Sequence, residues 1–482
     1  AYTTLACDVL ARFKRLDGYD VMFLTGTDEH GQKVEKAAAL AGVTPQAFTD
    51  RVSQNFRDLC ATMNYSNDAF IRTTEPRHKD ACQDLWKKLE ASGNIYLGSY
   101  SGWYAVRDEA FYGEDELTAG PNGKKIAPSG AEVEWVEEPS YFFKLSAWAE
   151  PLLKFYEDNP DFIAPVARRN EVVSFVKGGL HDLSISRTTF DWGVPVPGDE
   201  KHVMYVWLDA LTNYMTAVGY PDQNAEGYKR FWPADLHMIG KDILRFHTVY
   251  WPAFLLAAGL ETPKRVFAHG WWTVEGQKMS KSLGNVIAPD HLVATYGIDA
   301  SRYFLLREVP FGSDGDFSHK AIVHRTNGDL ANDLGNLAQR SLSMIAKNCG
   351  NAVPEHGAFT DADKALLGAA HGLLDRVRAE FDAQLFHKGL EAIWSVCGSA
   401  MCVSATGFWL RTWCSSCSLL VGASPSVSAR RSRSLSVIQL SPLSLCVSLC
   451  LSVSLCVSLC LSVSLCVSLC LSVSLCVSLC LS

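Results

Sequence analysis

The segment 276–285, GQKMSKSLGN, combines two lysines with small and hydroxyl side chains and has no apolar periodicity. Lysines carried by such a loop can hold a polyphosphate and stabilise the charge that develops at phosphorus during group transfer. Lys278 and Lys281 are therefore candidate catalytic residues, and a nucleotide is the expected ligand. The alternative is a solvated loop that binds nothing.

Acidic and imidazole side chains follow an apolar stretch near the N-terminus. Val21–Leu24 is predicted to be a short buried strand that ends in the polar segment TGTDEHG, with a helix after it. Ligands of open parallel sheets bind beyond the carboxyl ends of the strands, so Asp28 is placed to receive an ammonium group. The alternative is that Asp28, Glu29 and His30 cap the following helix.

Two stretches, YVWLDALTNYM and GKDILRFHTVYW, place aromatic side chains at helical spacing. One face carries Trp207, Ala210 and Tyr214, and the other carries Ile243, His247 and Trp251. Such stripes are usually core, but a core stripe seldom combines a hydroxyl, an imidazole and two indoles that lack partners. A thioether suits this lining, because sulfur gains from ring edges and accepts weak hydrogen bonds. The predicted substrate is methionine.

The elements that must position these residues alternate between strands and helices. Apolar runs at 236–240 and 265–270 each end in glycine before a helix or loop, which is typical of parallel strands. We therefore expect an α/β fold built on a doubly wound parallel sheet. Residues 98–175, rich in Tyr, Trp, Gly and turn signals, predict a mostly β insertion, and residues 326–396 are expected to be helical.

Charge and cysteine content narrow the possible partners. The chain has 44 Lys and Arg, four of them after residue 410, against 52 Asp and Glu, all before residue 397. This acidic balance argues against indiscriminate binding to phosphate backbones, but it allows an RNA partner recognised through local patches. The four cysteines before residue 397 are widely scattered, which indicates a reduced protein without a Cys-x-x-Cys metal pair.

The C-terminal segment is unlike the rest of the chain. Residues 434–482 contain no charge, and from about residue 445 the text LSVSLCVSLC repeats with a period of ten. This is low complexity of the kind that a translated dinucleotide tract encodes, not a domain. Frequent serines make it a poor lipid-facing helix, so no membrane association is expected.

Five ordered motifs together resemble one enzyme family. TGTDEHG, YVWLDAL, GKDILRFHTVYWPAFL, KMSKS and DLANDLGNLAQR are similar to segments of the methionyl-tRNA synthetases, which are class I aminoacyl-tRNA synthetases, and the match spans residues 1 to about 396. The resemblance implies a Rossmann-like core and a C-terminal helical anticodon-binding domain. A synthetase for leucine or isoleucine is disfavoured, because it would normally carry a much larger editing insertion.

The resemblance also implies a reaction and its partners. The carboxylate of methionine attacks the α-phosphorus of ATP, with Mg²⁺ accompanying the nucleotide, and pyrophosphate leaves. The methionyl group is then transferred to the terminal ribose of tRNA(Met). Alignment and electrostatic stabilisation would supply the rate.

Site residues can be carried over from the family motifs by position. The resemblance places the methionine side chain among Trp207, Ala210, Tyr214, Ile243, His247 and Trp251, and its amino group at Asp28. It places Arg187 near Asp28 and the phosphates, and assigns ATP binding to Gly240, Asp242, Lys278, Ser280 and Lys281, with Lys281 as the catalytic lysine. Asn336 and Arg340 match residues that read the anticodon, the alternative being a helical surface pair. Leu211 departs from the family, in which proline is common.

Many relatives carry a zinc knuckle with Cys-x-x-Cys pairs in the insertion, but GWYAVRDEAFYGEDEL has no cysteine, so a zinc-free form is expected. Such a form is bacterial-like or organellar-like, and we expect a mitochondrial or other organellar matrix, with the cytoplasm as the alternative. The expected segments are the first half of the core (1–97), the insertion (98–175), the second half of the core (176–325), a truncated helical anticodon-binding domain (326–396) and a low-complexity tail (397–482).

Both ends of the chain depart from the family pattern. The first strand of the sheet and a motif of the HIGH type are expected immediately before AYTTLACDVLARF, and the relatives continue differently after residue 396. We therefore expect impaired activity. The alternative from a different class is a catalytically dead remnant that binds tRNA.

Overall fold

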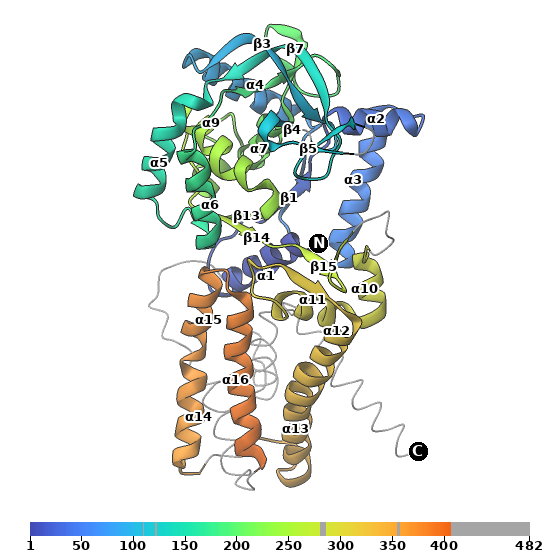
Figure 1. Cartoon of the computed structure of the whole chain (residues 1–482). Coiled ribbons are helices and arrows are strands. Elements are labelled where there is room, and N and C mark those ends of the chain that lie inside the picture. The colour runs from blue at the N-terminus through green and yellow to red at the C-terminus, as the bar shows by residue number, and fades with distance from the viewer. Residues whose placement is uncertain (109, 121–122, 280–285, 354–356, 406–482) are drawn as a thin grey trace. The chain divides into compact units, whose positions relative to one another are not determined.

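The computed structural model describes residues 1–108, 110–120, 123–279, 286–353 and 357–405 (Figure 1). The chain forms two compact units. The first unit comprises Val21–His269 with Ala1 and Thr3, and the second comprises Tyr2, Thr4–Asp20 and the chain from Gly270 onward. The repetitive segment, and with it the expectation that residues 434–482 pack no core, lies outside the described residues.

Parallel strands in the first unit give the expected α/β character. Strand β1 (Leu24–Thr27) pairs with β2 (Ala69–Arg72), and helices α2 (Gln32–Leu40) and α3 (Pro45–Thr62) connect them. Strand β14 (Val266–His269) lies between β13 (His237–Gly240) and β8 (Ile163–Ala164), again in parallel. Within the described residues these strands form separate sheets of two and three strands.

The first strand begins three residues later than its apolar run predicts. Asp68 fixes the backbone of Phe23 before the ladder starts, because its carboxylate accepts from the Phe23 amide at 2.7 Å and its own amide donates to the Phe23 carbonyl at 2.8 Å. Within the ladder, a Cβ atom at Gly26 would lie 2.1 Å from the Ile71 carbonyl oxygen. Glycine therefore permits this close approach of the two strands.

The expected insertion is β-rich only in its first part. Strands β3 (Ile95–Ala105) and β7 (Glu134–Phe143) form a long antiparallel ladder with β4 (Ala110–Tyr112) and β9 (Leu183–Ser184) at its edges, and β5 (Thr118–Ala119) pairs with β6 (Lys125–Ile126). Helices follow: the 3₁₀ helix η3 (Leu145–Trp148), α5 (Ala149–Asp158) and α6 (Val166–Lys177). A small antiparallel sheet comes next, made of β10 (Ser186–Arg187), β11 (Pro195–Val196) and β12 (Asp199–Met204).

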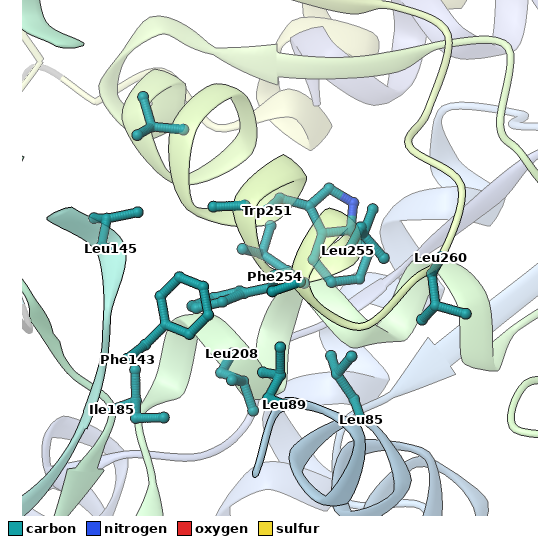
Figure 2. Close-up of a cluster of buried hydrophobic side chains, with 14 of the residues drawn as sticks. Leu85, Leu89, Phe143, Leu145, Ile185, Leu208, Trp251, Phe254, Leu255 and Leu260 are labelled. Atoms are coloured by element: carbon teal, nitrogen blue, oxygen red, sulfur yellow. The ribbon is translucent and has the colours of Figure 1, made fainter. Parts of the chain in front are cut away.

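Figure 2 shows part of the core of the first unit. Helices α4 (Pro76–Ala91), α7 (Val206–Thr216) and α9 (Trp251–Ala257) pack with β7. The labelled side chains in Figure 2 include Leu85 and Leu89 of α4, Phe143 of β7, Leu208 of α7 and Phe254 of α9. The rings of Phe143 and Phe254 meet edge to face, with centroids 4.9 Å apart. A short helix, α8 (Glu226–Phe231), precedes β13.

The second unit is mainly helical. Its elements are α1 (Tyr2–Leu16), β15 (Trp272–Val274), β16 (Gln277–Lys278), α10 (Pro289–Tyr296), α11 (Ile298–Arg307), β17 (Gly315–Phe317), α12 (His319–Arg325), the π-helix η6 (Thr326–Gly335), α13 (Asn336–Asn348), α14 (Asp361–His371), α15 (Leu373–Asp382) and α16 (Phe386–Ala405). Figure 1 shows α14 and α15 following one another alongside α16. The helical expectation for 326–396 is confirmed, and α16 continues past residue 396.

The first helix joins this unit through long-range contacts. Asp8, with 0% of its surface exposed, accepts hydrogen bonds from Arg12, one turn later, and from Arg302 of α11. The ring of Phe13 contacts Phe381 of α15 with centroids 4.9 Å apart. No helix in the described part of the chain is long and apolar enough to cross a membrane.

We predict that Asp8→Ala destabilises the second unit strongly, because it removes the carboxylate that faces the buried Arg302 guanidinium. The free energy of unfolding should fall by about 3–5 kcal/mol, as expected when one partner of a buried pair is lost. Denaturation followed by circular dichroism measures it. The control is Lys364→Ala, which breaks an exposed pair with Asp361 and should cost at most about 1 kcal/mol. Equal losses for the two variants would contradict the prediction.

Candidate active site

Aromatic side chains from three elements gather around a hydrogen-bonded Tyr–His pair. The Tyr214 hydroxyl on α7 lies 2.8 Å from Nε2 of His247, which lies on the π-helix η5 (Phe246–Tyr250). Trp207, which lies about two turns before Tyr214 on α7, stacks on Phe246 with centroids 3.9 Å apart and meets His247 edge on with centroids 6.2 Å apart. The predicted pocket residues Tyr214, His247 and Trp207 therefore lie together.

The hydrogen bonds of His247 define its tautomer. Its Nδ1 lies 3.0 Å from the carbonyl oxygen of Ile243, which can only accept, so Nδ1 carries the proton. Burial lowers the pKa of His247 to about 4, which keeps the ring neutral at physiological pH. Nε2 is then an acceptor, and the Tyr214 hydroxyl donates to it. The expectation that both side chains offer hydrogen bonds to a thioether is not supported in this arrangement, because the His247 proton goes to the Ile243 carbonyl and the Tyr214 proton goes to His247.

Ile243, His247 and Trp251 do not lie on one regular α-helix as their spacing suggested. The chain passes from the 3₁₀ helix η4 (Lys241–Ile243) through η5 into α9. A π-turn inserts an extra residue, which sequence periodicity does not reveal, and such turns occur frequently at functional sites. Trp251 is fully buried, and its Nε1 has no hydrogen-bond partner among the described residues. Ala210 is also buried, on α7.

His237 belongs to this cluster, although the sequence pattern of residues 236–240 predicts only a strand. Its ring stacks on Tyr214 with centroids 4.0 Å apart and meets His247 edge on at 6.2 Å. Burial and the charge of His247 lower the pKa of His237 well below its ordinary value. Neither of its ring nitrogens has a hydrogen-bond partner among the described residues. An imidazole inside an apolar run was the signal that could have identified it.

Asp28 lies at the carboxyl end of β1, as its position in the sequence suggested, and its side chain is exposed. The capping alternative is not supported for its neighbours: the N-cap of α2 is Gly31, Glu29 binds Arg72 at 2.8 Å, and His30 binds Asp209. The carboxylate of Asp28 also affects Cys82 on α4. Burial is the main cause that raises the pKa of the Cys82 thiol, and the carboxylates of Asp209 and Asp28 raise it further.

Arg187 is buried on β10, where Nη1 donates to the Ser184 hydroxyl at 2.8 Å and to the Ser186 carbonyl at 2.6 Å. Its guanidinium lies 4.9 Å from the ring centroid of Tyr205. These contacts fix the cation within the first unit. The expected nearness of Arg187 to Asp28 stays a prediction.

The residues expected to bind ATP are described only in part. Gly240 ends β13, and a Cβ atom there would lie 2.5 Å from the carboxylate of the exposed Asp242. Lys278 belongs to β16, but its side chain lies outside the described residues, as do Ser280 and Lys281. The roles of all five residues stay predictions.

Asn336 and Arg340 lie one turn apart on α13, as their spacing predicted. Asn336 is the first residue of this helix and is half-buried, whereas Arg340 is exposed. Their role in reading an anticodon stays a prediction.

Residues 1–342 match the family model described as tRNA synthetases class I (M). Curated relatives named Methionine--tRNA ligase are similar over most of the chain. The protein from Brucella suis is 60% identical over 400 residues, which cover 83% of this chain and 78% of the relative. The protein from Mesorhizobium japonicum is 61% identical, with 83% and 77% covered.

Solved structures give the same result. A Mycobacterium tuberculosis methionyl-tRNA synthetase in complex with methionyl-adenylate has a TM-score of 0.81 at 59% identity and covers 83% of this chain and 78% of its own. A second structure of the enzyme from this organism, bound by methionyl-adenylate, has a TM-score of 0.83 at 56% identity, with 86% and 85% covered. The expected α/β fold class is confirmed.

The expectation of a mitochondrial or other organellar matrix is wrong. The relatives at about 60% identity come from bacteria, such as Brucella and Mycobacterium, which agrees with the cytoplasmic alternative. The alternative of a remnant without ATP chemistry is not favoured either, because the identity extends over 400 residues.

The family model covers well over half of the chain, and the residues that it matches include the aromatic cluster, Asp28 and the lysine motif. Methionine, ATP and tRNA(Met) are the partners of such enzymes. The chain belongs to the methionyl-tRNA synthetases, the class I enzymes that ligate methionine to tRNA(Met) with ATP.

Proposed function

We propose that the cluster around Tyr214 and His247 binds the methionine side chain and that Asp28 receives the α-amino group. The observation that carries this proposal is the neutral His247, which accepts from Tyr214 inside a wall of indole rings. A thioether is apolar and polarizable, and it gains from contact with ring edges such as these.

The remaining assignments follow from the motifs. Gly240 and Asp242 bind the nucleotide, Lys278, Ser280 and Lys281 bind its phosphates, and Arg187 stabilises the charge that develops near the methionine carboxylate. Mg²⁺ accompanies ATP and neutralises part of its charge. Residues 98–175 hold no zinc, since they offer no cysteine. Asn336 and Arg340 of α13 read the anticodon. They lie in residues 326–396, the segment expected to form the anticodon-binding domain.

We predict that Tyr214→Phe weakens methionine binding about tenfold, because the buried Nε2 of His247 in the pocket wall loses its donor, and leaving a buried acceptor unsatisfied costs about 1–3 kcal/mol. Calorimetric titration of the full chain with methionine measures the dissociation constant. Tyr96→Phe is the matched control, since the Tyr96 hydroxyl binds Asp182 on the protein surface. Unchanged affinity in Tyr214→Phe would remove the basis of the assignment.

Lys281→Ala tests the catalytic assignment separately from binding. Methionine-dependent exchange between ATP and pyrophosphate should fall about 10²–10³-fold, the usual cost of losing one group that stabilises developing charge. The dissociation constant for methionine should not change. The control is Lys264→Ala, which removes an exposed lysine paired with Asp235. A loss of methionine affinity equal to the loss of rate would argue against a role in catalysis.

The buried neutral His247 also makes stability depend on pH. The unfolded chain takes up a proton near pH 6.5 and the folded chain only near pH 4, so protonation favours unfolding as the pH falls through this window. The stabilising contribution is complete above pH 6.5 and declines below it by up to about 1.4 kcal/mol per pH unit. Urea denaturation at several pH values should give a shallower slope for His247→Gln than for the wild type. Parallel slopes would contradict this prediction.

A further inference from the structure

A buried carboxylate on the pocket helix has an imidazole on each oxygen. Asp209 of α7 has no exposed surface. Its Oδ2 lies 2.6 Å from Nδ1 of His30, and its Oδ1 lies 2.7 Å from Nε2 of His78. His30 belongs to the segment after β1 and His78 to α4, so three elements of the first unit meet at one carboxyl group.

The carboxyl group is ionised. Burial alone would raise the pKa of Asp209, but the charge and hydrogen bond of His30, together with those of His78, lower it below its ordinary value. A carboxylate can only accept, so each imidazole donates the hydrogen bond. Charge-assisted bonds of this kind are stronger than neutral ones, and breaking them in a buried site is costly.

The link between His30 and Asp209 joins the two parts of the proposed methionine site. His30 follows Asp28 by two residues, and Asp209 lies on α7 between Trp207 and Ala210. The pocket for the side chain and the carboxylate for the amino group are therefore held at a fixed spacing by one buried hydrogen bond. A shift of the substrate or its contacts by about 1 Å is enough to cost a large factor in enzyme function.

We propose that Asp209 is a positioning residue, which acts through His30 to set the distance between Asp28 and the methionine side-chain pocket. This proposal rests on the proposed function of that site. Its consequence is specific: loss of the link reduces the contribution of the substrate's amino group to binding, and not merely the stability of the protein.

A metal ion is the rival explanation of this cluster. Nε2 of His78, Sγ of Cys82 and a carboxylate oxygen of Asp209 all lie within 4.8 Å of one another. However, the 2.7 Å between Nε2 of His78 and Oδ1 of Asp209 is a hydrogen-bond distance. The geometry favours the hydrogen-bonded network.

The test compares two ligands on the full chain by calorimetric titration: methionine and desamino-methionine, which has hydrogen in place of the α-amino group. The ratio of their dissociation constants measures the amino-group contribution. His30→Leu removes the donor to Asp209. His30→Asn keeps a donor near the Nδ1 position. His78→Leu breaks the other half of the network, between α4 and α7, and reports the effect of destabilisation alone.

We expect His30→Leu to reduce the wild-type preference for methionine about tenfold, the equivalent of one charge-assisted hydrogen bond lost from positioning. His30→Asn should retain most of the preference. His78→Leu should lower the melting temperature but keep the ratio. If His30→Leu does not fold, His30→Gln replaces it, because its longer amide displaces the donor from the Nδ1 position and should cause the same loss.

Three results would overturn the proposal: a folded His30→Leu protein with the wild-type ratio, equal losses in His30→Leu and His78→Leu, or stoichiometric zinc in the wild type whose removal abolishes methionine binding. Failure of the proposed function has a different signature. In that case the wild type itself would not bind methionine, or would bind both ligands equally, before any substitution is made.

Discussion

A charged carboxylate inside an apolar core needs hydrogen-bond donors at its oxygens, and Asp209 is such a carboxylate in the first unit. Its two oxygens take one hydrogen bond each from His30 and His78. The helix α7, the helix α4 and the exit of β1 can meet only in an arrangement that brings these three side chains together. Around the charge, the core is made of large apolar side chains such as Leu85, Leu208 and Phe254 (Figure 2). Packing supplies the bulk of the stability, while the ionic contacts restrict how the elements can slide.

The aromatic cluster around Tyr214 and His247 lies partly on α7 as well, but its buried imidazole is neutral whereas Asp209 is charged. Burial keeps His247 neutral, and its proton is committed to the Ile243 carbonyl. The described side chains around His247 are therefore mainly aromatic rings, with one hydroxyl that is already bonded to His247. In the proposed site, Asp28, which is exposed at the end of β1, is the charge that receives the amino group. This separation suits a substrate with an apolar side chain and a charged backbone, which is what methionine offers.

The second unit also contains a buried charge with a partner, the ion pair between Asp8 and Arg302, which holds two helices together. Asp8 and Arg302 are both buried, and they hold α1 to α11 although almost 300 residues separate them in the sequence. Phe13 adds an aromatic contact with Phe381. The N-terminal helix is thus part of a helical unit made mainly of the C-terminal half of the chain. The acidic composition suggests that any RNA contact depends on particular side chains such as Arg340 and not on net charge.

Sequence alone determined what local patterns can encode. The order of the motifs identified the family. Local spacing put Trp207 and Tyr214 on one helical face, and the resemblance to the family placed His247 in the same pocket. Other features needed the tertiary structure. The start of β1 depends on Asp68, the π-turn at His247 adds a residue that periodicity cannot show, and the role of Asp209 depends on imidazoles that lie far away in the sequence. Each of these is decided by a partner brought close by folding, and a hydrogen bond between distant residues leaves no signal in the sequence around either one.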